Sequence, residues 1–184
     1  MSDLSAFRIT KAEYARDTAQ LLDGEGGRRA GGRWHRRGSP VVYLGSSRAL
    51  CLLEILVHLE IHPRDDAAMR VSAEFVIPEA VLGAAQVRRI SAGELHALDP
   101  AWRQFGNRTC KRIGIQWFRD GDRWALQVPS AVIPQEWNLV VNCSHPVVRD
   151  LIARGGIKVE PVSIDPRITE IISADALRGR RSKP

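Results

Sequence analysis

The stretch from residue 31 to residue 54 constrains the fold more than any other part of the chain. It opens with paired glycines and an arginine cluster, continues as a short β-branched run that ends near Tyr43, and enters an apolar segment that contains Glu54. Residues 40–44 are typical of a strand. We interpret this stretch as the scaffold of a functional site, because it offers cations, an aromatic hydroxyl and an acid in close succession.

The apolar segment at residues 49–59 predicts a helix. The polar residues before it include Ser46 and Ser47, either of which can cap the first turn. Apolar residues lie all round this helix, which predicts that it is buried within the fold.

Several shorter elements follow from local patterns. Strands are predicted at residues 7–10 (at a sheet edge), 69–77, 87–90, 124–128, 138–142 and 157–164, and helices at 11–22, 91–97, 107–118 and 145–154, with one helical turn within 78–85. The glycine-rich residues 24–32 predict an irregular loop that is either mobile or shaped by a ligand. Many short strands without a regular alternation of long helices predict an α+β fold.

The length of 184 residues suits one domain with a real core. We expect this domain to span residues 1–177 and to be followed by a disordered basic tail at 178–184. The formal net charge is +6, and much of the excess lies in this tail and in the arginines of residues 28–37. Such a charge permits nucleic acid, a nucleotide ligand or an acidic partner protein, and does not choose among them.

The cysteines and the apolar runs indicate the compartment. The chain has 3 cysteines, widely spaced and without a Cys-x-x-Cys pair, which favours reduced thiols in a cytosol over a disulfide framework or a structural zinc site. The 5 histidines also lack metal-ligand spacing, so we expect no metal. No run near twenty apolar residues and no signal-peptide pattern is present, which predicts a cytoplasmic protein without a membrane partner.

Arg33 is the first candidate binding residue. A planar guanidinium among glycines suits a bidentate contact with a diphosphate. The alternative is that Arg33, one of several arginines in this region, only solvates a loop. The nearby glycines complete no dinucleotide fingerprint and no Walker lysine follows, which argues against a Rossmann or P-loop nucleotide site.

Three other side chains are candidates for chemistry or binding. Glu54 stands in an apolar helix, where an unpaired carboxylate is costly, so it has either a function or an ion-pair partner. Tyr43 ends a strand and could stack on a ligand ring or orient a ribose hydroxyl, or be an ordinary half-buried tyrosine. Ser130 has no Gly-x-Ser-x-Gly elbow around it, so a hydrogen-bonding role is favoured over a nucleophilic one.

Taken together, these residues resemble the RES domain. The resemblance rests on Gly32-Arg33-Trp34 with Gly38 and Val42-Tyr43, on Ala49-Leu50 and Leu53-Glu54 with Val57-His58, and on Val128-Pro129-Ser130 with Ile133-Pro134 and Asn138. It covers nearly the whole chain in the family's order. The family is named for an Arg, a Glu and a Ser, which here would be Arg33, Glu54 and Ser130. His35 stands where an Asn is frequent in the family.

The resemblance implies a fold similar to diphtheria-toxin-like ADP-ribosyltransferases and a function as the toxin of a type II toxin–antitoxin system. Such a toxin consumes NAD⁺ by cleaving the nicotinamide–ribose bond through hydrolysis or phosphorolysis, and some members ADP-ribosylate a host protein. NAD⁺ is then a substrate, and no further cofactor is expected. The implied partner is an Xre-type antitoxin that blocks the active site and is the only link to DNA.

The resemblance also implies roles for the candidate residues. Glu54 would stabilise an oxocarbenium-like centre at the ribose. Arg33 would contact the diphosphate, Tyr43 would stack or contact the ribose, and Ser130 would position the nicotinamide ribose or carboxamide. Trp34 completes the implied substrate-binding set.

Two alternatives to NAD⁺ destruction stay open at this point. In the first the acceptor is a protein side chain, since nothing in the sequence chooses among water, phosphate and protein. In the second the chain is a nucleic-acid-binding module that uses residues 28–37 and the basic tail, which predicts steeply salt-dependent binding and indifference to the loss of Glu54.

Overall fold

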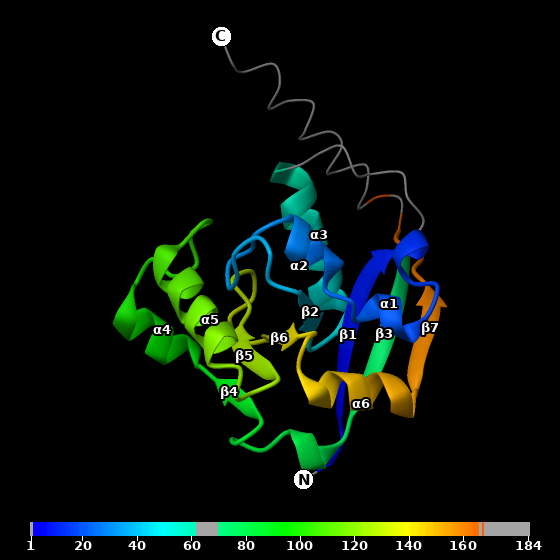
Figure 1. Cartoon of the computed structure of the whole chain (residues 1–184). Helices are drawn as coiled ribbons and strands as arrows, with labels where there is room; N and C mark the ends of the chain where they lie inside the picture. Colours follow the sequence, from blue (N-terminus) through cyan, green and yellow to red (C-terminus); the bar gives the residue numbers. More distant parts are fainter. Residues whose placement is uncertain (1, 62–69, 166, 168–184) are drawn as a thin grey trace.

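The computed structural model describes residues 2–61, 70–165 and 167, with the side chains of residues 58–61 left out. The described strands are β1 (Leu4–Lys11), β2 (Val41–Gly45), β3 (Arg70–Ile77), β4 (Val87–Arg89), β5 (Ala125–Pro129), β6 (Trp137–Asn142) and β7 (Ile157–Pro161). They form a seven-stranded sheet in the order β4-β5-β6-β2-β1-β3-β7 (Figure 1). Only β4 and β5 pair in parallel, and every other neighbouring pair is antiparallel.

The described helices are α1 (Thr18–Leu21), α2 (Glu25–Arg29), α3 (Arg48–Ile61), α4 (Ala92–Leu98), α5 (Arg108–Asp120) and α6 (Pro146–Arg154), with short 3₁₀ turns η1 (Ala12–Tyr14) and η3 (Glu79–Val81). A mixed sheet covered by short helices is the α+β fold that the sequence predicts. The strands predicted at 40–44, 87–90, 124–128 and 138–142 and the helices at 91–97, 107–118 and 145–154 are confirmed, with shifts only at their ends.

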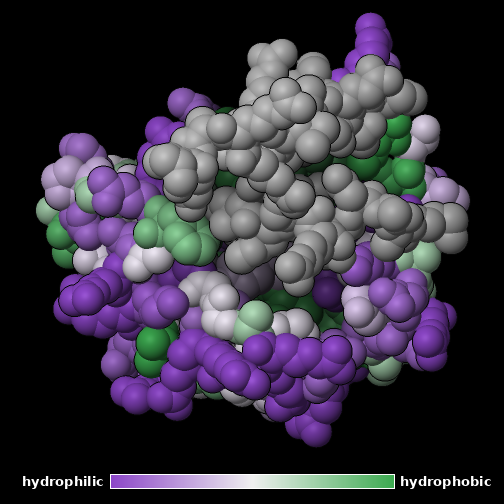
Figure 2. All heavy atoms as spheres, turned by 90° about the horizontal axis from the view of Figure 1, so that it is seen from above, coloured by the Kyte–Doolittle hydropathy of each residue, from purple (hydrophilic) through white to green (hydrophobic). Residues whose placement is uncertain are grey.

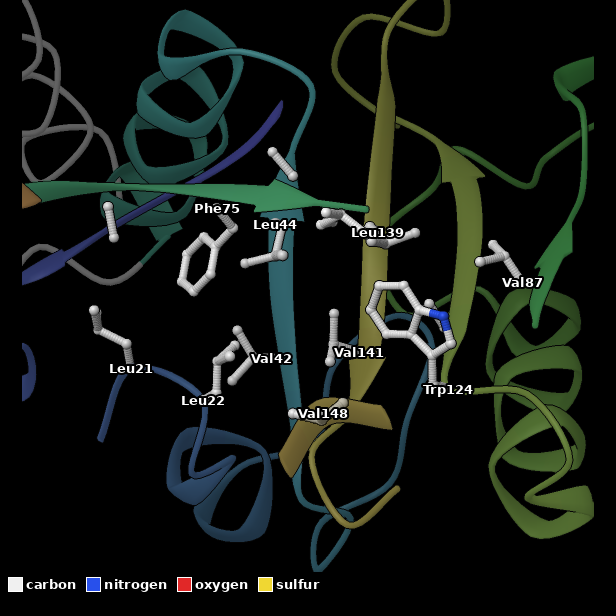
Figure 3. Packing of buried hydrophobic residues seen from close by; sticks show 14 of the residues in the cluster. Leu21, Leu22, Val42, Leu44, Phe75, Val87, Trp124, Leu139, Val141 and Val148 are labelled. Atoms are coloured by element: carbon white, nitrogen blue, oxygen red, sulfur yellow. The ribbon is translucent and has the colours of Figure 1, made fainter. Parts of the chain in front are cut away.

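Each face of the sheet carries its own hydrophobic cluster. On one face, α1 and α6 pack against the strands, and Figure 3 shows this packing around Leu21, Leu22, Val42, Leu44, Phe75, Trp124, Leu139, Val141 and Val148. On the other face, α4 and α5 cover β5 and β6 through a cluster that includes Leu95, Trp117, Leu126 and Val140. The same face carries Tyr43 and Asn138, because side chains alternate along β2 and β6.

Strand β1 differs from its prediction in both length and place. It is an interior strand that pairs with β2 on one side and β3 on the other, so the predicted edge position is wrong. It also runs to Lys11, and the helix predicted at 11–22 is reduced to η1 and the four-residue α1. The reason is tertiary: β1 pairs with β3 along its entire length, from Leu4 opposite Ile77 to Lys11 opposite Arg70.

The glycine-rich segment at residues 24–32 is helical over residues 25–29 and irregular at residues 30–32, where an irregular loop was predicted throughout. It contains α2, which begins after Gly24 in the left-handed region (φ 72°). A Cβ on Gly27 would lie 2.5 Å from the Ser39 carbonyl oxygen, so this glycine lets α2 pack closely against the chain that enters β2. The carboxylate of Glu25 pairs with Arg28 at 3.1 Å and with Arg29 at 3.7 Å. Gly24 and Gly27 therefore serve packing within the described chain, whereas nothing lies within 4 Å of the Cβ position of Gly26.

Helix α3 is capped as predicted but is less buried than predicted. The Ser47 hydroxyl accepts a hydrogen bond from the Leu50 amide at 3.1 Å. Leu50 is fully buried, whereas Leu53 and Val57 are 37% and 40% exposed. The prediction of a helix buried on all sides is therefore wrong. Helix α3 packs on β1 and β2, and its apolar residues continue onto a side that includes the exposed Leu53 and Val57.

Gly114 allows a close contact between α5 and the chain before β2. A Cβ at this position would lie 1.8 Å from the carbonyl oxygen of Trp34. The glycine weakens the helix by its propensity, yet α5 is continuous from Arg108 to Asp120. The close contact with Trp34 thus requires glycine at position 114, although glycine has a low helix propensity.

We expect Gly114→Ala to lower the free energy of unfolding by about 1–3 kcal/mol or more, because the new methyl group overpacks a backbone contact. Gly26→Ala is the matched control, since Gly26 lies in α2 with nothing within 4 Å of its Cβ position. This control should be neutral or stabilising by up to about 1 kcal/mol. Urea unfolding of the three proteins measures both effects, and a Gly114→Ala variant as stable as the parent would contradict the described packing.

Candidate active site

The candidate site is organised around the carboxylate of Glu54 on α3. Its Oε1 atom accepts hydrogen bonds from the Ser130 hydroxyl at 2.7 Å and from the Asn138 side-chain amide at 2.8 Å. Within the described part of the chain, Glu54 takes part in no ion pair with a lysine or arginine. Neutral donors therefore hold the carboxylate in place of the buried ion pair considered from the sequence.

Ser130 orients the carboxylate from the turn that follows β5. Its side chain is fully buried, and its hydroxyl oxygen accepts the amides of Val132 at 3.0 Å and Ile133 at 3.1 Å. These two donors occupy the oxygen, so the hydroxyl proton is directed to Glu54. The hydrogen-bonding role favoured from the sequence agrees with this geometry.

Asn138 is a site residue whose role could not be predicted from the sequence. It lies near the start of β6, on the face that also presents Val140, and donates from its Nδ2 to Glu54. The available signal was its place among the apolar residues at the start of β6, where a polar side chain on the covered face needs a partner. The partner could not be inferred, because it lies on a helix far away in the chain.

The hydroxyl of Tyr43 is fully engaged by the chain that precedes β2. It lies 2.8 Å from Nδ1 of His35 and accepts the Trp34 amide at 3.3 Å. The other ring nitrogen of His35 lies 3.0 Å from the carbonyl oxygen of Ala30, which can only accept, so we assign the ring proton to Nε2. Nδ1 then accepts the proton of Tyr43, and it is the tyrosine ring that remains for a ligand.

Glycine at position 32 makes this arrangement possible. A Cβ on Gly32 would lie 2.6 Å from Cε1 of His35 and 2.9 Å from the hydroxyl oxygen of Tyr43. His35 itself is only 4% exposed. The role of His35 could not be predicted from the sequence, since neither its spacing from other residues nor its neighbours indicate that it is buried and hydrogen-bonded to Tyr43.

The environment shifts the pKa values of both ring groups. Burial raises the pKa of Tyr43 well above its ordinary range, and the nearby Glu54 adds to this, while the Trp34 amide and Arg33 oppose it. Burial lowers the pKa of His35, the Ala30 carbonyl opposes this, and the charge of Lys111 on α5 lowers it further. Tyr43 is therefore a neutral donor to a neutral His35 at ordinary pH.

Arg33 and Trp34 lie beside the site but are largely engaged by the fold. The guanidinium of Arg33 donates from Nη1 to the carbonyls of Trp102 and Gln104, both at 2.7 Å, and from Nη2 to that of Arg103 at 3.0 Å. The Trp34 side chain is 3% exposed and belongs to the cluster under α5. Their roles toward a substrate stay predictions.

The structure thus brings together most of the predicted residues on one face of the sheet. Glu54 and Ser130 are in direct contact, and Tyr43 and Arg33 are close enough to influence one another electrostatically. Glu54, Tyr43, Arg33 and Asn138 keep partial exposure, whereas Ser130 and Trp34 are buried. Seen from above, the described surface is hydrophilic over most of its rim, with smaller hydrophobic areas between (Figure 2).

No three or more His, Cys, Asp and Glu side chains within residues 2–57, 70–165 and 167 form a group suited to a metal ion. Among the helices that the structure describes, none has the length and apolar character needed to cross a membrane.

The chain matches the model of the RES domain over residues 5–165, and it therefore belongs to the RES-domain family. A Toxin Res of Pseudomonas putida is 35% identical over 147 residues, which cover 80% of this chain and 92% of that protein. A Prs ADP-ribosylating toxin of a Sphingobium species is 35% identical over 153 residues, which cover 82% of this chain and 88% of that protein.

Among solved structures, the chain is similar to one in the crystal structure of the M. tuberculosis MbcT–MbcA toxin–antitoxin complex. The TM-score is 0.64 at 20% sequence identity, and the match covers 94% of this chain and 90% of that one. This similarity supports the fold, including the α+β arrangement of the sheet.

The buried His35 predicts a loss of stability on mild acidification. Histidine titrates near pH 6.5 in an unfolded chain, and its pKa is lower in this fold. Between these values the unfolded state binds more protons, so stability falls as the pH drops below about 6.5. We expect the free energy of unfolding of the parent to decline more steeply between pH 7 and about 5 than that of His35→Gln, by at most about 1.4 kcal/mol per pH unit.

Urea unfolding at several pH values measures this difference. His145, whose pKa is also lowered, is common to both proteins and cancels in the comparison. The carboxylates with lowered pKa values, such as Asp99, affect stability only in more acidic solution. Parallel stability curves for the parent and His35→Gln would show that His35 does not titrate on unfolding in this way.

Proposed function

We propose that this protein is the toxin of a toxin–antitoxin system and consumes NAD⁺ by cleaving the bond between nicotinamide and ribose, with water or phosphate as the acceptor. Family membership and the relatives named Toxin Res support the class. The observation that carries the chemistry is the carboxylate of Glu54, held by two neutral donors on a single oxygen.

The geometry of Glu54 suits the breaking of a glycosidic bond. Departure of nicotinamide leaves positive charge on the ribose ring, and a fixed negative charge stabilises that transition state. Because Ser130 and Asn138 both bind Oε1, Oε2 is the oxygen that we assign to the ribose. Uncharged donors orient the carboxylate without cancelling its charge, as a salt bridge would.

The surrounding residues take supporting roles in this proposal. Tyr43 offers its ring for stacking, since its hydroxyl is engaged by His35 and Trp34. Ser130 is buried and acts by orienting the carboxylate of Glu54 through a hydrogen bond. In this proposal it supports Glu54 from the side away from the substrate. Arg33 already donates to three carbonyls, so it contacts the diphosphate through the remaining N–H groups of its guanidinium. NAD⁺ is the substrate, and no other cofactor takes part.

ADP-ribosylation of a host protein is the second candidate function. It is favoured by the name of the Sphingobium relative, an ADP-ribosylating toxin that is 35% identical. ADP-ribosyl transfer breaks the same bond of NAD⁺ and needs the same carboxylate, so the two candidates differ only in the acceptor. Adenine-labelled NAD⁺ separates them, because only protein transfer leaves the label on protein.

The nucleic-acid-binding alternative loses part of its basis. Arg28 and Arg29 pair with Glu25 within α2, so part of the basic cluster is neutralised within the fold. The other part of that alternative, the basic tail at 178–184, lies outside the described residues.

An antitoxin is the partner implied by the proposed function. The similar fold in the MbcT–MbcA complex belongs to a toxin–antitoxin pair, and we propose an equivalent partner for this chain. We further propose that this antitoxin is of the Xre type, covers the site around Glu54 in the cytoplasm and provides any contact with DNA.

Glu54→Gln tests the proposed chemistry without a change of shape. A glutamine can accept both hydrogen bonds on its own Oε1, so the substitution keeps these contacts, removes the negative charge and puts an NH2 group in the place of Oε2. We expect NAD⁺ consumption to fall about 100-fold or more. Chromatography of NAD⁺ and its products, with and without phosphate, measures the rate and distinguishes ADP-ribose from a phosphorylated product.

Glu94→Gln is the matched control. Glu94 accepts the amide and the hydroxyl of Ser91 on a single oxygen, at 2.7 Å and 2.6 Å, in an exposed capping box on α4. It should consume NAD⁺ at the parent rate. Full activity of Glu54→Gln would remove Glu54 from the reaction and with it the proposed mechanism.

A further inference from the structure

The loop between α4 and α5 links the two sides of the candidate site through a pair of arginines. Arg33 reaches into this loop and donates to the carbonyls of residues 102–104. Arg103 belongs to the same turn and reaches outward from it. Its Nε donates to the carbonyl of Ala131 at 2.9 Å and its Nη2 to that of Val132 at 3.3 Å.

The carbonyls that Arg103 binds belong to the turn that orients Ser130. The amides of Val132 and Ile133 donate to the Ser130 hydroxyl oxygen, and the Ser130 hydroxyl donates a hydrogen bond to Glu54. Arg103 thus holds the peptide units that supply the donors to Ser130. Only the Ser130 hydroxyl separates this turn from the carboxylate.

Arg103 is anchored on a braced loop, although its own side chain is exposed. Asp99 accepts the Ala101 amide at 2.9 Å and the Asn107 side chain at 2.8 Å, which closes the loop on itself. Trp102 is 3% exposed and fixes the turn to the hydrophobic cluster under α5. The guanidinium of Arg103 therefore connects this braced loop to the turn that carries the carbonyls of Ala131 and Val132.

We infer that Arg103 is a positioning residue for Glu54, which acts by holding the turn at residues 131–133 so that Ser130 aims the carboxylate. The inference rests on the proposed function, because the carboxylate must be aimed for a reaction. Arg103 touches neither Glu54 nor Ser130 in the described contacts, so its effect is transmitted through the backbone of this turn. Removal loosens the carboxylate and slows the chemical step without removing a substrate contact.

The first experiment measures the kinetics of NAD⁺ consumption by Arg103→Ala and Arg103→Lys. We expect kcat to fall about tenfold in Arg103→Ala while KM stays within about twofold of the parent value. Arg103→Lys keeps the charge but lacks the fork that reaches both carbonyls, so it should recover little. Low concentrations of guanidinium ion should restore part of the activity of Arg103→Ala.

Arg123→Ala is the matched control. The Nε of Arg123 also donates to a backbone carbonyl, that of Ala84 at 3.1 Å, but Arg123 precedes β5 whereas Ser130 follows it. This variant should keep the kcat of the parent and gain nothing from guanidinium. If Arg103→Ala keeps its kcat, or if KM rises and lysine restores it, Arg103 is not a positioning residue.

A second measurement does not depend on turnover. Amide hydrogen exchange at Val132 and Ile133 should be faster in Arg103→Ala than in the parent and in Arg123→Ala, because the turn has lost its clamp. Unchanged exchange at these two amides would overturn the inference whatever the kinetics. If the parent does not consume NAD⁺, the proposed function fails, and the exchange measurement alone decides whether Arg103 holds the turn.

Discussion

The hydrogen bonds that converge on one carboxylate oxygen of Glu54 are the interaction on which the site depends. Their donors, Ser130 and Asn138, lie 76 and 84 residues away from Glu54 along the chain. Helix α3, the turn after β5 and the start of β6 must therefore all be in place before the acid is aimed. The sheet achieves this, since β2 leads into α3 and pairs directly with β6, which in turn pairs with β5.

A second constraint is the close packing of the segment before β2 between the sheet and α5. Gly114 lets the helix approach the backbone of Trp34, and Gly32 leaves room for His35 and the hydroxyl of Tyr43. The segment that carries Arg33 is thus held on both sides by contacts in which any side chain would interfere. The arginine cluster of the sequence is in this way attached to a rigid part of the fold.

The sequence predicts those features that depend on local pattern. The β-branched run before Gly45 and the apolar run that contains Glu54 predict β2 and α3, and the spacing of short strands predicts the α+β class. Strand β1 was misplaced and the helix at 11–22 was wrong, because long pairing with β3 decides both. The glycines at residues 24–32 predict a loop that is either mobile or shaped by a ligand, because close packing and flexibility favour the same residue type.

In the candidate site, too, some features were predictable from the sequence and others were not. The apolar surroundings of Glu54 single it out in the sequence, the resemblance to the RES domain adds Ser130, and the structure joins the two by a hydrogen bond. The hydrogen-bond partners of His35 and Asn138 could not be predicted, since a buried hydrogen bond leaves no pattern in the sequence. That Arg33 binds the carbonyls of residues 102–104 could not be foreseen either, because those acceptors are backbone atoms that every residue has.

The most direct test of the account is a double-mutant cycle on NAD⁺ consumption with Glu54→Gln, Asn138→Ala and the double variant. If Asn138 acts only by aiming the carboxylate of Glu54, its removal slows the parent but has no further effect once the charge at position 54 is gone. The double variant is then as slow as Glu54→Gln alone. Losses that simply add, or a parent that leaves NAD⁺ intact, would contradict the central claim that this oriented carboxylate cleaves NAD⁺.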